Sequence, residues 1–551
     1  MMMSKQPGTW ISVMSGKCHR YGATLLVFLL AILWLSLMTA VSSAELTLPG
    51  IFSDHMVLQQ GMKVPIWGTA GAGSSITVRF REQTQNTKAD AQGKWRVQLD
   101  SIDATPDQTG SDLIVGCDGV NVAIHDVVVG EVWLGAGQSN MALPVSADKR
   151  YQGVLPEDIA SAKYPNLRMI GNLTTTQKTG WSVCTPDTIS EWSALMFYMG
   201  RNLHQELKVP VGLVVAAQGL TAVAAWMSPD DFMADEGCSK AWANYCNIEY
   251  PRVKAEYPAK IAEWERLYGT SATTPIQKGV PVPPRPTLPK GPPNPKGPNC
   301  GGCYKSLVPV VGYGIRGLAW DQGESGSGFP GVEWNTAMGG LISGWRRAWG
   351  QDFPVLYVQK PSGGGTAFSG VQRKRTPKFD SIAPDADVAG GFYRFMFQSL
   401  EKYPGVAMGI SVDLNGNLHP LPKDRYGKRM AELALGKVYG KTDAWMPPQY
   451  TKNAVVGNQV RVDFDHIGKG LITPKDEPVT GFIIAGNDRH FVWAQAKIEG
   501  DTVVVWSDQV AEPVAVRYAW AGQVQWANLY GKNELPVLTF RTDDWPQEIK
   551  L

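Results

Sequence analysis

Five apolar, strand-length segments separated by helix-length segments constrain the fold of this chain more than any other feature. The first is Val127–Leu134, and the others follow at Val211–Ala217, Ile315–Trp320, Val355–Val358 and Val406–Val412. Nearly continuous apolar runs of this kind are typical of strands buried on both faces. Helix-like stretches, among them Ala194–Leu207 and Trp334–Ala348, lie between several of the strands. The alternation predicts an α/β fold with a parallel sheet packed between helices and with ligands beyond the carboxyl ends of its strands.

Segments with period-two alternation of apolar and polar residues lie on both sides of this region. Those before it are Lys63–Gly68, Ser75–Phe80 and Lys94–Leu99, and those after it are Gln459–Phe464, Phe482–Ala485, Thr502–Trp506 and Val514–Tyr518. Such alternation is typical of half-buried strands in antiparallel sheets. We therefore predict an N-terminal β domain over 45–125, a central domain over 126–440 and a C-terminal β domain over 441–551.

Residues 230–305 interrupt the strand–helix alternation and are interpreted as an insertion. A helix-like stretch near Tyr250–Leu267 is followed by ten prolines between Pro275 and Pro298. Proline has no N–H to give to a sheet, and a proline tract favours an extended polyproline II conformation on the surface. The simplest interpretation is a stiff connector, and a wall beside the ligand cleft is the alternative.

Residues 1–44 have the pattern of a secretory signal peptide. Basic residues end at Lys17 and Arg20, an apolar run covers Ala23–Val41, and small residues stand at Ser42 and Ala44 before the expected cleavage point. We expect a secreted or periplasmic protein with no stable membrane association after cleavage. The alternative is an uncleaved anchor, because the apolar run approaches the length that spans a bilayer.

The charge balance and the cysteine content bear on nucleic-acid binding, disulfide formation and metal binding. Removing the leader takes away Lys5, Lys17 and Arg20, which leaves 49 basic residues against 50 acidic ones. This balance gives no support for nucleic acid as a partner. Six cysteines remain, at positions 117, 184, 238, 246, 300 and 303, an even number that is compatible with one to three disulfides of open pairing. Small buried thiols are the alternative for Cys117 and Cys184. The pair Cys300 and Cys303 lacks a second ligand pair at zinc spacing, so we predict no metal and no cofactor.

A serine follows the first apolar strand in the turn Gly135–Met141, where it stands as Ser139 after Gln138. A serine among small residues at a strand end exposes its oxygen above the sheet, and the N–H groups of the turn point at a developing oxyanion. Met141 occupies the place of the second glycine of an α/β-hydrolase elbow, so this turn is not that motif. Ser139 is the candidate nucleophile.

A base for this serine is selected among the six histidines that follow the leader; the seventh, His19, lies within it. His55, His125, His466 and His490 lie in or beside the β domains, and His204 lies within a predicted helix. The remaining histidine, His419, follows the apolar run that ends at Val412 and therefore belongs at the same edge of the sheet as Ser139. We predict that His419 is the general base.

Two further strand ends offer donors for an oxyanion. The strand that ends at Ala217 is followed by Gln218 and Gly219, and a glycine allows close approach of the backbone to a ligand. The strand that ends at Trp320 leads to Gln322, whose side-chain amide is a donor, and to Glu324, a candidate for orienting neighbouring groups. The predicted oxyanion hole combines the Ser139 N–H, Gly219 and Gln322.

These motifs, taken in chain order, resemble the sialate O-acetylesterase family of the SGNH hydrolase superfamily. The carrying segments are Phe52–Gln60, Gly130–Leu134, Gly137–Met141, Pro210–Leu213 before Gly219, Gln322–Ser325, His419–Pro420, Arg425–Arg429, Gly481–Gly486 and Ala515–Trp520. The resemblance implies a three-layer αβα domain flanked by β domains, and metal-free hydrolysis of O-acetyl esters of sugars through an acetyl-serine. In that scheme Ser139 is the nucleophile, His419 the base, and Ser139, Gly219 and Gln322 the oxyanion hole.

The chain also departs from the family pattern. The paired glycine of the family is Gly219–Leu220, and Asn417 and Gly416 occupy the places where many relatives have an aspartate. The third carboxylate therefore stays open between Asp413, Glu324 and a Ser–His dyad aided by a backbone carbonyl. Asp321 replaces a usual tyrosine, and Gly326 a usual asparagine.

The expected substrate is an acetylated carbohydrate, most directly an O-acetylated sialic acid, with acetylated xylan or another polysaccharide as the alternative. A sialate carboxylate needs a cation, for which the candidates are Arg316, Arg346, Arg347, Arg373 and Arg375. A non-catalytic glycan-binding protein of the same fold is the competing class, since twenty tryptophans offer stacking surfaces.

Overall fold

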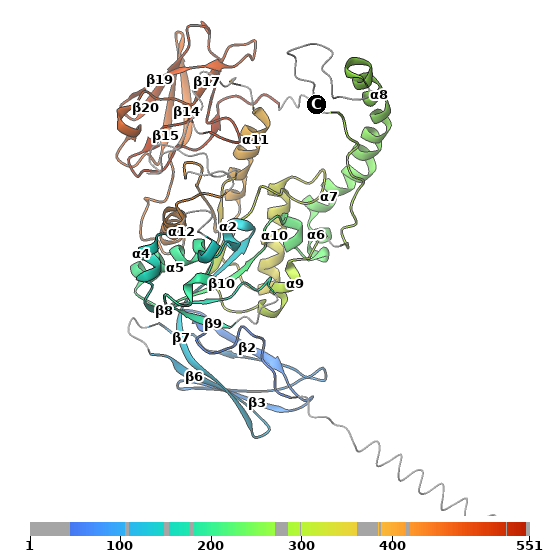
Figure 1. Ribbon diagram of the computed structural model, residues 1–551, viewed down its shortest axis with the longest axis vertical. Coiled ribbons are helices and arrows are strands. Elements are labelled where there is room, and N and C mark those ends of the chain that lie inside the picture. The colour runs from blue at the N-terminus through green and yellow to red at the C-terminus, as the bar shows by residue number, and fades with distance from the viewer. Residues whose placement is uncertain are drawn as a thin grey trace, which may run out of the picture.

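The computed structural model arranges the chain as three stacked parts (Figure 1). It describes residues 45–546 except 105–108, 148–153, 176–179, 270–284, 298, 361–383, 385–386, 415–418 and 525. An N-terminal β part, blue in Figure 1, lies at one end, a mixed α/β part lies in the middle, and a C-terminal β part, orange to red, lies at the other end. The predicted signal peptide, 1–44, lies outside the described residues.

The N-terminal part is built from short antiparallel strands. Strand β2 (Val64–Thr69) pairs with β5 (Lys94–Leu99), and β3 (Ser75–Phe80) pairs with β4 (Gln83–Lys88) and β6 (Ser111–Cys117). Every second side chain of β5 is buried, as the sequence alternation predicts. The flanking antiparallel sheet is confirmed.

Strand β7 (Val120–Gly137) joins this part to the middle of the molecule. Its first half pairs antiparallel with β6, and β1 (Val57–Gln59) pairs parallel with residues 128–130. Its second half lies at the centre of the main sheet. The strand therefore continues through the boundary predicted at 125/126, and the two parts share one strand.

The main sheet has the order β13-β12-β11-β7-β10-β8-β9. Its further strands are β8 (Tyr164–Ile170), β9 (Trp181–Cys184), β10 (Val211–Ala217), β11 (Gly317–Asp321), β12 (Val355–Val358) and β13 (Val406–Gly409). All neighbours are parallel except β8 and β9, which form an antiparallel pair. The sheet is thus mixed where the sequence predicted a parallel one, because β9 returns directly alongside β8 without a crossover helix.

Helices cover both faces of the main sheet. Helices α5 (Ala194–Leu207) and α12 (Lys423–Lys437) pack together on one face, where Leu213 and Leu356 of the sheet join their core. Helix α10 (Trp334–Trp349) covers the other face with α6 (Pro229–Ala234) and α7 (Glu236–Asn244). The sheet side chains alternate between these two cores, as expected for strands that are buried on both faces.

The remaining elements lie around the middle part. Helix α8 (Tyr250–Tyr268) extends from α7 within the predicted insertion and lies away from the sheet in Figure 1. Helix α11 (Val388–Met396) leads to the C-terminal part. There β14 (Gln449–Val456), β15 (Gln459–Asp465), β20 (Thr502–Trp506) and β19 (Gln495–Glu499) form one antiparallel sheet; β18 (Val492–Trp493), β17 (Phe482–Ala485), β21 (Ala515–Tyr518) and β23 (Phe540–Arg541) form another.

The cysteines and the described helices give two further findings. All six cysteines outside the leader are free thiols, so no disulfide forms between described residues, and Cys117 and Cys184 are the buried thiols of the alternative interpretation. Cys117 ends β6, Cys184 ends β9, and Cys303 donates through its Sγ to the side-chain oxygen of Gln218. Within the described ranges, no helix has both the length and the apolar character needed to cross a bilayer.

Candidate active site

Ser139 stands where β7 ends at the carboxyl edge of the main sheet. Gly137, the last residue of β7, has φ +129°, and a side chain there would collide with the Asp321 carbonyl of the neighbouring strand. The Gln138 N–H donates to that carbonyl over 2.8 Å. Helix α2 (Ser139–Ala142) then begins at the serine itself. As the first residue of a helix, Ser139 has an N–H with no acceptor inside that helix.

His419 lies within hydrogen-bond distance of this serine. Its Nε2 is 2.9 Å from Ser139 Oγ, although the two residues are 280 positions apart. Burial lowers the pKa of the His419 imidazole, and the positive charges of Lys423 and Lys360 lower it further, whereas the Asp321 carboxylate raises it. The imidazole is therefore held in the neutral form, which can accept a proton from the serine.

Gly219 lies directly beside the nucleophile. A Cβ placed on Gly219 would be 3.7 Å from the Cβ of Ser139. The loop that carries it is held by the Gln218 N–H, which donates to the Gly137 carbonyl over 2.9 Å. Two segments that follow neighbouring strands, β7 and β10, are thus brought together as predicted from their positions at the sheet edge.

Gln322 has its side-chain amide engaged within the protein. Its Nε2 donates to the carbonyls of Thr221 and Gly326, each over 3.1 Å, and its Oε1 accepts from Trp334 Nε1 over 2.9 Å. The buried amide therefore ties the Gly219 loop to the loop after β11. Its predicted contribution to the oxyanion hole stays a prediction, because a donation to substrate requires one of these two bonds to be exchanged.

Glu324 acts on the residue before the nucleophile. Its Oε2 accepts from Gln138 Nε2 over 2.5 Å, and its Oε1 lies 3.4 Å from Lys360 Nζ. Lys360 is completely buried and also lies 2.7 Å from Asp321 Oδ1. Burial alone would lower the pKa of Lys360, but the two carboxylates raise it above its ordinary value. Lys360 therefore stays charged and connects Asp321 to Glu324.

The first turn of α12 completes this buried network. Lys423 donates through Nζ to Asn140 Oδ1 over 2.8 Å, and the Tyr426 hydroxyl donates to Asp321 Oδ2. Residues three positions apart share a helix face, which directs both side chains toward the site. The sequence interpretation did not find Lys360, Lys423 or Asn140; their only signal was their position next to strand ends or predicted site residues.

Asp413 is paired with an arginine on α12. Both of its oxygens accept from Arg429, Oδ1 from Nη1 over 2.5 Å and Oδ2 from Nη2 over 2.7 Å. The carboxylate is buried, and the pair fixes it between β13 and α12. Each oxygen keeps a second lone pair, so the predicted role of Asp413 in orienting His419 stays a prediction. The residues between them, 415–418, lie outside the described part.

Three of the arginines considered for a sialate carboxylate are engaged elsewhere. Arg316 pairs with Glu131, Arg347 pairs with Asp231, and Arg346 donates to the carbonyls of Phe353 and Pro404. Arg373 and Arg375 lie outside the described residues. The first three are therefore not candidates for binding a sugar carboxylate in this arrangement.

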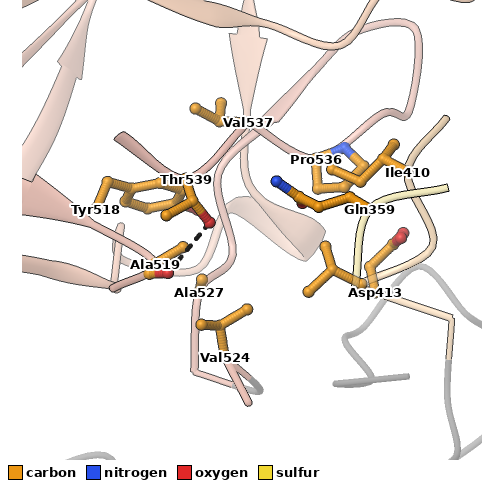
Figure 2. Close-up of a pocket in the computed structure, with 11 residues that line it drawn as sticks. Gln359, Ile410, Asp413, Tyr518, Ala519, Val524, Ala527, Pro536, Val537 and Thr539 are labelled. Carbon is orange, nitrogen blue, oxygen red and sulfur yellow. Dashed lines mark hydrogen bonds between the residues drawn. The ribbon is translucent and has the colours of Figure 1, made fainter. Parts of the chain in front are cut away.

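A small cavity lies between the main sheet and the C-terminal part (Figure 2). Gln359 and Asp413 reach it from the ends of β12 and β13, and Tyr518, Val524 and Val537 line it from the C-terminal side. Figure 2 shows the Thr539 hydroxyl donating to the Ala519 carbonyl along its wall. The lining does not include Ser139 or His419, so this cavity belongs to the domain junction.

Comparisons with known proteins agree with this geometry. A scan of protein-family models finds no match. The curated sialate O-acetylesterase of Mus musculus is 23% identical over 526 residues, covering 85% of this chain and 88% of the mouse protein. That of Homo sapiens is 22% identical over 552 residues, covering 90% and 92%. The chain is a relative of the sialate O-acetylesterases.

A solved structure supports the same relationship. The crystal structure of XAC1771, described as a novel carbohydrate acetylesterase from Xanthomonas citri, matches with a TM-score of 0.68 and 26% identity. The match covers 91% of this chain and all of that chain. Its description and those of the sialate O-acetylesterase relatives identify this chain as a carboxylic ester hydrolase.

Proposed function

We propose that the chain is an exported serine esterase of the SGNH type that removes O-acetyl groups from carbohydrate. The single observation that carries the proposal is the 2.9 Å separation between Ser139 Oγ and His419 Nε2 at the carboxyl edge of the sheet. The names of its relatives, sialate O-acetylesterase and carbohydrate acetylesterase, supply the substrate class. O-acetylated sialic acids are the first candidate substrates, and acetylated xylan is the alternative.

Catalysis proceeds in two half-reactions. Ser139 Oγ attacks the acetyl carbonyl carbon while His419 Nε2 takes the hydroxyl proton, and the N–H groups of Ser139 and Gly219 stabilise the oxyanion. Collapse of this intermediate breaks the bond to the sugar oxygen, which leaves with the proton from His419. Water then attacks the acetyl-serine with His419 as base, and acetate and free Ser139 are released.

Three acidic or amide side chains are proposed to position these groups. Glu324 holds Gln138 and thereby the turn that carries the nucleophile, and Gln322 holds the loop of Gly219. Asp413 is the proposed carboxylate behind His419, acting from its pair with Arg429.

The test is acetate release from a panel of acetylated sialosides and xylo-oligosaccharides by residues 45–551, with an aryl acetate as a reporter ester. Ser139→Ala and His419→Ala are each expected to lower kcat by roughly 10⁴ or more, because the loss of one member of a catalytic unit costs about as much as the loss of the whole unit. Glycan binding without turnover by the unaltered protein would favour the non-catalytic class instead.

A further inference from the structure

Leu220 is an apolar side chain held in the open beside the nucleophile. It is 94% exposed, the highest exposure among the large hydrophobic residues that the structure describes as exposed. It follows Gly219, whose missing Cβ would be 3.7 Å from Ser139 Cβ. Consecutive Cα atoms are about 3.8 Å apart, which places the Leu220 Cα within about 9 Å of Ser139 Cβ. The exposed leucine therefore lies at the edge of the candidate active site, which we call the rim.

The backbone of Leu220 is in a conformation that leucine rarely adopts. Its φ is +63°, in the left-handed region, which costs a non-glycine residue roughly 1–2 kcal/mol. The resembling family has a second glycine at this place, and glycine adopts such a φ without that cost. The chain therefore carries both an unfavourable backbone and an unfavourable apolar exposure at one position. Such combinations persist chiefly where surrounding structure holds them and function uses them.

The surrounding hydrogen bonds hold this loop rigidly. The Gln218 N–H is bound to Gly137, and the Thr221 hydroxyl donates to the Gln218 carbonyl over 2.7 Å, closing the turn around Leu220. Trp226 Nε1 donates to the Thr221 hydroxyl over 3.0 Å, and Gln322 Nε2 donates to the Thr221 carbonyl. Both flanks of Leu220 are thus fixed, and its side chain cannot retreat into the core without breaking them.

We propose that Leu220 is a specificity-determining residue that packs against the sugar ring of the substrate; this rests on the proposed carbohydrate esterase function. Leu220 is not part of the pocket for the acetyl group. That pocket must enclose a small methyl group and would therefore be buried, whereas the Leu220 side chain is almost wholly exposed. Only the larger alcohol portion of the ester extends from Ser139 to this rim. The apolar C–H face of a pyranose ring is the chemistry that an exposed leucine recognises.

The test compares Leu220→Asn with the unaltered protein on an acetylated oligosaccharide and on an aryl acetate. Asparagine keeps a similar size and tolerates the left-handed φ better, so the melting temperature should stay equal or rise. The ratio of kcat/KM for the oligosaccharide to that for the aryl acetate should fall roughly five- to tenfold, mainly through KM. The separate variant Leu220→Met should keep this ratio within about twofold of that of the unaltered protein, because methionine keeps the apolar contact area.

The matched control is Leu267→Asn, the same change on an exposed leucine of α8, which should leave the ratio unchanged. Equal losses on both substrates, or no loss in Leu220→Asn, would overturn the inference, since Leu220 would then act on the ester centre or on nothing. A lower melting temperature without a change of ratio would overturn it as well. If the unaltered protein hydrolyses the aryl acetate but none of the acetylated carbohydrates, the proposed function fails first and this inference with it.

Discussion

Replacement of Lys360 by methionine removes a buried cation that lies 2.7 Å from Asp321 Oδ1 and 3.4 Å from Glu324 Oε1. At an effective dielectric constant of 20, these distances correspond to attractions of about 6 and about 5 kcal/mol. Loss of the ammonium also removes its own desolvation cost, so the net destabilisation is about 3–5 kcal/mol, as for other broken buried pairs. Spread over the roughly 300 residues of the central part at about 2.1 cal/mol/K per residue, this loss lowers the melting temperature by about 5–8 °C at neutral pH.

The loss should depend on pH in a defined direction. Without the cation, the Asp321 and Glu324 carboxylates lose the positive charge that lies between them and repel each other, so protonation of one of them is favoured in the folded state. A carboxyl group with a raised folded pKa is stabilising below its unfolded pKa of ~4, and that contribution is lost as pH rises through the folded pKa. Lys360→Met should therefore be less destabilising at pH 5 than at pH 8.

Thermal unfolding followed by tryptophan fluorescence at the two pH values measures this effect. The double variant Lys360→Met with Asp321→Asn should recover more than half of the loss, because it removes one uncompensated charge while the amide oxygen still accepts from Tyr426. Lys428→Met, at an exposed pair with Glu432, is the surface control and should change little. An equal loss at both pH values, or none, would refute the electrostatic reasoning.

Three further predictions concern the catalytic groups. Because burial and neighbouring lysines lower the pKa of His419, the acidic limb of kcat/KM should lie below ~6.5; a limb above that value would contradict the assigned base. Glu324→Gln should lower kcat roughly tenfold with KM nearly unchanged, measured on the aryl acetate, because a neutral amide holds Gln138 less firmly. Asp413→Asn should lower the melting temperature by several degrees, because Arg429 loses a bidentate partner; a fall in kcat of ~10² or more would assign Asp413 to the imidazole.

Much of the fold and the central pair of the site follows from local sequence patterns. Apolar runs mark strands buried on both faces, so β10 and β12 have the bounds that the sequence predicted. Parallel strands end at a common edge, so residues after β7 and β13 were expected on the same side of the sheet. Ser139 and His419 were found by that reasoning and by elimination, and the structure places their side chains in contact.

The parts that sequence could not predict depend on partners far along the chain. Strand β8 contains Pro165 and the charged Arg168 and has no apolar run, so neither β8 nor its antiparallel neighbour was predicted. The break expected near His125 reflects polar residues within β7, which the pairing with two sheets overrides. In the sequence Lys360 resembles an ordinary exposed lysine, because its burial depends on one carboxylate at the end of β11, Asp321, and one in the loop that follows, Glu324.

In the mechanism that we propose, the same buried charges allow a weakly basic imidazole to serve both half-reactions. Burial, Lys423 and Lys360 together lower the pKa of His419, and in this mechanism the two positive charges also favour the negative charge that forms on the oxyanion beside Ser139. They disfavour the imidazolium that forms at the same moment, whereas the Asp321 carboxylate favours it. A site with only the lysines would have a base too weak to take the serine proton, and a site with only Asp321 would hold the proton and slow its return to the leaving sugar. Lys360 binds Asp321 directly, so the lowering effect of Lys360 on the pKa of His419 and the raising effect of Asp321 come from one ion pair. Lys360→Met should therefore shift the acidic limb of kcat/KM upward, and Asp321→Asn should shift it downward.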